Sequence, residues 1–166
     1  MLAPPRERGI GSPTVKLTNL SRGELVAMIG GVLLGVSLFV KCYEARPENP
    51  NANIDGVKGI QTFWDVHDLS RYLLLAAAIA PFILAYIIIR EHELSWPRGQ
   101  VTMVVAIAVI GIVFYLGIVD RPGEPASEIE LEIGWYGAML GALLMLAGSV
   151  IRQAETETAR KPPGVL

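Results

Sequence analysis

The residues of this chain best suited to chemistry lie in two short acidic segments. One segment places a histidine between two aspartates just after a tryptophan, and the other alternates glutamate with aliphatic residues. Carboxylate and imidazole groups can bind a divalent cation, and they can also exchange protons with a substrate. The candidate outer-face interaction residues are therefore Trp64, Asp65, His67, Asp68, Glu128, Glu130 and Glu132.

Neither segment has the ligand spacing of an established metal loop, and acidic side chains on a solvated loop commonly face water. The sequence also lacks a glycine-rich phosphate loop, a nucleophile triad, a CxxC pair and a clustered basic patch. We therefore predict no catalytic residue, no metal, no cofactor and no nucleic-acid partner. An enzyme acting on lipid stays open as a minor alternative, with Asp65, His67 and Asp68 as its candidate residues.

Four apolar stretches must position these segments, and they cover residues 25–40, 69–89, 101–119 and 133–151. None shows the polar face of a soluble helix, and about 20 such residues cross a hydrocarbon layer of about 30 Å. A chain of 166 residues is too short to bury four helices that are apolar all round. We predict an all-α membrane protein, a four-transmembrane-helix bundle with spans near 24–41, 68–90, 100–119 and 133–152.

The predicted transmembrane domain covers residues 21–152, between disordered cytoplasmic tails at 1–20 and 153–166. With both tails inside, the cytoplasmic side holds nine Lys and Arg residues and the outer side five. The positive-inside rule then favours an N-in, C-in orientation. We expect a multi-pass protein of the bacterial plasma membrane, with lipid as its first partner and an acidic outer face.

Local signals set the boundaries of several elements. Ser21 and Glu24 form a capping-box pattern at the start of the first helix, and Asp55-Gly56 is a favoured hairpin turn. The alternation over residues 128–133 has the period of a strand. Two structures stay open for this strand, namely a small β cap formed with the first loop and an extended lead-in to the last helix.

The first span is predicted to close with Lys41, whose long side chain can reach the interface, and with Cys42. Cys42 is the one cysteine of the chain, so an internal disulfide is excluded. We expect it to serve as a small apolar residue, with intermolecular pairing as the alternative.

Glycines at four-residue spacing lie in the first and last spans, where they form a smooth groove that lets another helix approach closely. We therefore expect these two spans to pack most tightly. Packing within one bundle and assembly of a homo-oligomer both remain open. The predicted helix-packing residues are Gly31, Gly35, Gly134, Gly137, Gly141 and Gly148.

The chain resembles four-helix membrane proteins of an actinobacterial type that have no assigned activity. The resemblance rests on Arg22-Gly23-Glu24-Leu25, on Trp64 before Asp68-Leu69, and on the glycine-rich run over residues 134–148. It implies the four-helix topology over residues 22–152 and no mechanism. The paired loop cysteines of claudin-like barrier proteins are missing.

The expected function is that of a non-enzymatic accessory or assembly subunit, which acts through helix packing and its acidic outer face. Its expected partner is a membrane protein or a second copy of the chain. The alternative is a small transporter or channel unit with Pro81 as a hinge. No charged residue lies deep in a span, and ion-coupled transport usually needs one.

Overall fold

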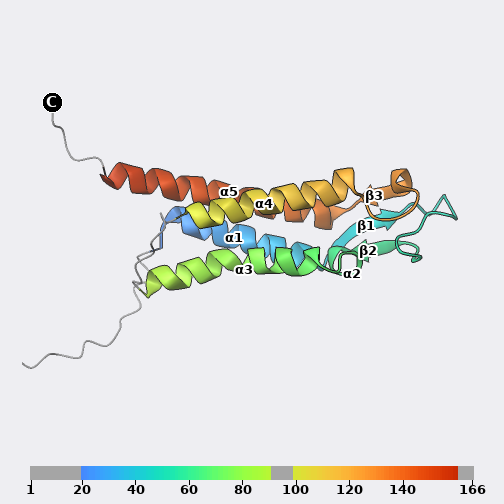
Figure 1. Ribbon diagram of the computed structural model, residues 1–166, viewed down its shortest axis with the longest axis horizontal. Coiled ribbons are helices and arrows are strands. Elements are labelled where there is room, and N and C mark those ends of the chain that lie inside the picture. The colour runs from blue at the N-terminus through green and yellow to red at the C-terminus, as the bar shows by residue number, and fades with distance from the viewer. Residues whose placement is uncertain (1–19, 91–98, 161–166) are drawn as a thin grey trace, which may run out of the picture.

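Four long helices lie side by side and a small sheet covers one end of them (Figure 1). The computed structural model describes residues 20–90 and 99–160, with residues 156–160 described by their backbone alone. The long helices are α1 (Arg22–Ser37), α3 (Ser70–Ile89), α4 (Gln100–Phe114) and α5 (Ile133–Arg160). A π-helix, η2 (Tyr115–Val119), extends α4 without a break.

Three helices of the described chain are long and apolar enough to cross a membrane. They cover Ser70–Ile89, Gln100–Val119 and Ile133–Glu155, which are 20, 20 and 23 residues long. The remaining long helix, α1, has 16 residues. At 1.5 Å per residue it is about 24 Å long, which is less than a full hydrocarbon layer.

Two predicted boundaries of the helices are wrong. The first helix ends at Ser37 rather than near residue 41, because Lys41 begins a strand that pairs with two others. Lys41 therefore does not extend from a helix end. The last helix continues to Arg160, although disorder was predicted from residue 153. The predicted disorder of residues 1–19 and 161–166 lies outside the described residues.

The capping box at the start of α1 is confirmed. The Ser21 hydroxyl accepts the Glu24 N–H at 3.3 Å, and the Ser21 N–H donates to Glu24 Oε2 at 2.8 Å. Two amides that have no partner within the helix are satisfied in this way, so the helix begins at a defined residue.

The most extensive contact between two elements is the one between α1 and α5. A methyl group built on Gly141 would lie 2.6 Å from Leu34 N and 2.8 Å from Gly30 O. One built on Gly148 would lie 2.5 Å from both Ala27 N and Gly23 O. The two backbones touch at these points, and only glycine leaves room for that.

The other predicted packing glycines have different neighbours. Gly31 and Gly35 face α3 rather than α5, and Gly31 approaches Ala78 O. Gly134 lies against the carbonyl groups that lead into the first strand, and Gly137 lies against the Ser37 hydroxyl. Gly23 and Gly30, which the sequence analysis did not select, are the glycines through which α1 meets α5.

The sequence leaves two structures open for the alternating segment, and the structure has the β cap, a three-stranded antiparallel sheet in the order β2-β1-β3 (Figure 1). Its strands are β1 (Lys41–Ala45), β2 (Ile60–Thr62) and β3 (Ile129–Leu131). We call residues 41–68 and 120–132 the cap. It also contains the short helix α2 (Phe63–Val66) and the 3-10 turn η3 (Ala126–Glu128).

The hairpin turn in the cap is confirmed as well. Asp55 and Gly56 both have positive φ, at 49° and 79°. Ile54 and Val57, on either side, exchange backbone hydrogen bonds of 2.8 and 2.9 Å. Two consecutive positive φ values match the twist of a two-residue hairpin, which explains the Asp-Gly pair.

The hydrophobic core runs without a break from the helices into the sheet. Leu34, Leu74 and Met145 are fully buried among the helices, and Tyr43 and Phe63 continue this core beneath the strands. The cap is therefore part of the same packed unit as the helices.

Replacing Gly141 with alanine should lower the free energy of unfolding by about 1–3 kcal/mol, because the methyl group would meet backbone atoms of α1. Gly111 is the matched control, since a methyl group built there meets nothing within 4 Å. Unfolding by a denaturing detergent measures both variants. Equal stability of Gly141→Ala and Gly111→Ala would contradict the close approach of the two helices.

Candidate functional site

The carboxylates of the predicted outer face are distributed over separate contacts rather than gathered into one site. Asp65 closes a capping box at α2, where its Oδ2 accepts the Thr62 hydroxyl at 2.6 Å. Asp68 is 94% exposed and pairs with Arg71, at 3.3 Å. These two neighbours in sequence therefore hold different local structures.

The three glutamates of the second acidic segment pair with two basic residues that belong to or follow β1. Glu130 lies 2.7 Å from Arg46 Nε, and Glu128 lies 3.8 Å from Arg46 Nη1. Glu132 lies 2.8 Å from Lys41 Nζ. Hydrogen bonding to Lys41 lowers the pKa of Glu132, and Glu132 raises the pKa of Lys41 in turn. Among the described side chains of residues 20–90 and 99–155, no three His, Cys, Asp or Glu residues are placed to hold a metal ion.

An aromatic cluster surrounds Arg71 where α3 begins. The guanidinium lies 5.4 Å from the Trp64 ring centroid and 5.1 Å from that of Tyr72, and its Nη1 donates to Trp64 O at 2.9 Å. The Trp64 ring also packs on Phe39, with 4.9 Å between centroids. Rings with both apolar and polar contacts are typical of the boundary between membrane and water.

His67 lies at the junction between the cap and the helices. Its Nε2 lies 3.1 Å from the Tyr43 hydroxyl, and its ring packs on Phe63 at 4.4 Å. The Tyr43 hydroxyl also donates to Leu116 O at 3.4 Å. Burial raises the pKa of Tyr43 and lowers the pKa of His67. The pair therefore joins β1, the α2 region and η2 through neutral side chains.

Side chains from other elements donate to carbonyl groups near the π-helix. Trp135 Nε1 donates to Val113 O at 2.9 Å, and Arg121 Nε donates to Gly117 O at 2.9 Å. Arg121 also donates to Ile129 O in β3, at 2.8 Å. A π-helix displaces the usual pattern of backbone hydrogen bonds, and these donors satisfy one carbonyl group within it and one just before it. No sequence signal marks this change of helix type.

The cap exposes acidic side chains that have no structural role in the sheet. Glu48, Asp55, Asp120 and Glu124 are all exposed, and they come from both segments of the cap. The sheet joins the two loops, so the positions of these groups relative to one another are fixed.

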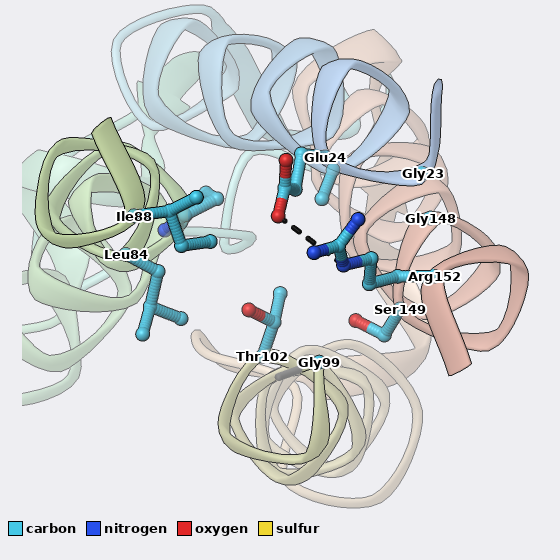
Figure 2. A pocket seen from close by; sticks show the side chains of 11 residues that line it. Gly23, Glu24, Leu84, Ile88, Gly99, Thr102, Gly148, Ser149 and Arg152 are labelled. Carbon is cyan, nitrogen blue, oxygen red and sulfur yellow. Dashed lines mark ion pairs between the residues drawn. The ribbon is translucent and has the colours of Figure 1, made fainter. Parts of the chain in front are cut away.

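A second candidate site lies at the end of the helices opposite the cap, in a cavity of about 30 Å³ (Figure 2). All four long helices, with Gly99 at the N-cap of α4, contribute to its wall. Its charged residues are Glu24 of α1 and Arg152 of α5, whose Oε1 and Nε atoms lie 3.3 Å apart. Their side chains are only 11% and 14% exposed. We call this space the Glu24 cavity.

From the sequence, Glu24 is predicted to cap a helix and Arg152 to end a span, and their pairing is not predicted. Glu24 lies near the start of α1 and Arg152 in the C-terminal part of α5. The two glycine-rich helices are antiparallel, so both residues lie at the same end of the helix pair. That shared position is the signal that could have predicted the contact.

No protein-family model, curated protein or solved structure matches this chain.

The Cys42 thiol should not react with maleimide in the folded protein at about pH 8. Cys42 is fully buried, and burial raises its pKa to about 12. Complete reaction is expected after unfolding in dodecyl sulfate. The exposed position Ser127 supplies the control, as a Ser127→Cys variant that should react while folded. Equal rates at the two positions would contradict the burial of Cys42.

The free energy of unfolding should decrease as the pH falls below about 6.5, the ordinary pKa of histidine. Burial lowers the pKa of His67 in the folded protein, and Asp120 and Asp55 oppose this shift. The unfolded chain therefore binds more protons at this residue as the pH falls. The free energy of unfolding keeps its full value above about pH 6.5, where His67 is neutral in both states, and decreases on acidification.

Unfolding measured between about pH 7.5 and 5.5 tests this dependence on His67. The control is His67→Phe, which keeps a ring against Phe63 and removes the titrating group. Its stability should vary less with pH than that of the unchanged protein. The same slope in both proteins would assign the effect to other groups.

Proposed function

We propose that this chain is a four-span membrane protein that works as a non-enzymatic accessory or assembly subunit, with the cap as its interaction surface. The observation that carries the proposal is the folding of two outer loops into one sheet. Loops that only connected spans would need no common structure. Here they form a packed platform with exposed carboxylates.

The position of α1 supports its assignment as the fourth span. Its first turn touches α5 at Gly148, and the carbonyl groups of Val40 and Lys41 touch α5 at Gly134. The segment from Gly23 to Val40 thus runs beside nearly the whole apolar part of α5. Leu38, Phe39 and Val40 lengthen the apolar path beyond the helix itself. We infer that α1 lies at the same membrane depth as α5.

The orientation follows from the proposed four spans. Four crossings place the start of α1 and the end of α5 on one side, and Figure 1 has both at the end opposite the cap. The distribution of Lys and Arg favours the cytoplasm for that side. The cap then lies outside the cell membrane.

Packing supports an assembly role over conduction. Ser37 and Ser149 are buried polar residues of the described helices, and each donates to the carbonyl group four residues earlier, at 2.7 and 2.8 Å. Their hydroxyl groups are therefore used within their own helices. Ala106 and Val109 of α4 and Ala142 of α5 are buried members of the same apolar core.

The partner best matched to the cap is a cationic segment of another membrane protein. Glu48, Asp120 and Glu124 are exposed on loops that the sheet holds in place. Opposite charges across such a surface accelerate association and select among partners. The interaction should therefore weaken as salt is raised, because the acidic groups are exposed to solvent.

The test is recovery of a partner with the full-length chain from native membranes in mild detergent. A triple variant with Glu48→Lys, Asp120→Lys and Glu124→Lys should lose the partner that the unchanged chain recovers. Its reversed charges would repel a cationic segment. Lys58→Glu is the matched control, because it changes another exposed cap residue and adds an acidic group. This control should keep the partner.

Two results would overturn the proposal. One is a strict monomer from which no partner is recovered. The other is equal recovery by the unchanged chain and the triple variant, with no effect of salt.

A further inference from the structure

The Glu24 cavity has two chemically different sides (Figure 2). Pro81, Leu84 and Ile88 of α3 form an apolar side. Glu24 and Arg152 provide charged groups from α1 and α5, across from α3 in this view. The wall of this cavity therefore offers polar side chains on one side and apolar side chains on the other.

The two oxygens of Glu24 differ in their partners. Oε2 accepts the Ser21 N–H at 2.8 Å as part of the capping box. Oε1 is fully buried beside Arg152 Nε, and it accepts no hydrogen bond from the described residues. Buried carboxylate oxygens nearly always accept hydrogen bonds, so Oε1 indicates a donor outside the described residues.

The charges and hydroxyl groups of the wall define that donor further. Arg152 compensates the charge of Glu24, so the site attracts neither an anion nor a cation strongly. The Ser149 hydroxyl gives its proton to Met145 O, which leaves its oxygen as an acceptor. The polar side therefore favours a neutral molecule that donates hydrogen bonds.

The volume limits this molecule to the size of water. The cavity offers about 30 Å³, and a single water molecule needs about 10–15 Å³ measured in this way. Two water molecules fit, and a larger solute does not. Gly23 and Gly99, at the starts of α1 and α4, line the cavity, so it lies where the helices meet the aqueous phase opposite the cap.

We propose that the Glu24 cavity is a water-binding site, in which about two water molecules enter from the end opposite the cap and one donates to Glu24 Oε1. The site is separate from the cap and does not depend on the proposed partner. It keeps a carboxylate hydrated at the boundary of the membrane, where burial would otherwise be costly.

Hydroxyl-radical footprinting by X-ray radiolysis tests this proposal with a probe the size of water. Radicals form from bound water and oxidise adjacent side chains, so Leu84 should be oxidised in proteoliposomes. Its neighbour Ile83 is 54% exposed on the outer surface of α3, where lipid should exclude water, and it should not be oxidised. Water labelled with heavy oxygen should add its isotope to Leu84.

A filling variant shows that the oxidation depends on the cavity. Ala27→Leu places three further carbon atoms at the cavity wall and should abolish the oxidation of Leu84. Ala147→Leu, on the exposed side of α5, is the control and should leave it unchanged. If Ala27→Leu does not fold, Thr102→Leu fills the same space.

The exposed cap residue Ile60 should be oxidised in every sample and so confirms that radicals formed. A dry cavity would give oxidised Ile60 and no oxidised Leu84 in the unchanged protein, and this result would overturn the proposal. Oxidation of Leu84 that persists in the filling variant would also overturn it.

Discussion

The contact between the backbones of α1 and α5 is the constraint on which the rest of the structure depends. Gly23 with Gly148 and Gly30 with Gly141 bring the two helix backbones within van der Waals distance. Between helices in lipid, such close packing replaces much of the hydrophobic driving force that operates in water. Because the first and last helices are joined in this way, the strands that follow α1 and precede α5 emerge side by side. The pairing of β1 with β3 then needs little further ordering.

An ion pair lies beside apolar surface at each end of the α1–α5 pair, one in the cap and one at the Glu24 cavity. Each end has charged side chains close to apolar surface, where an unpaired charge would be costly. At the cap, Lys41 pairs with Glu132 across β1 and the start of α5. At the far end, Glu24 of α1 pairs with Arg152 of α5. The Lys41–Glu132 pair is open to solvent, whereas the Glu24–Arg152 pair is largely buried and borders a cavity.

Short-range patterns made much of this structure predictable. The capping box at Ser21, the turn at Asp55-Gly56 and the alternating strand around Glu130 depend on a few neighbouring residues, and all three are present, although the sequence leaves the pairing of the strand open. The contact of Glu24 with Arg152 depends on how two distant helices face each other, which periodicity does not determine. The π-helix near Gly117 depends on donors such as Trp135 and Arg121, which reach it only in the folded chain.

The short connections between α1 and β1 and between β3 and α5 have a mechanical consequence. Only Leu38, Phe39 and Val40 separate α1 from β1, and Glu132 alone separates β3 from α5. Neither junction contains a slack linker that could absorb a displacement. The sheet therefore cannot tilt relative to α1 and α5 without changing the backbone conformation of these few connecting residues.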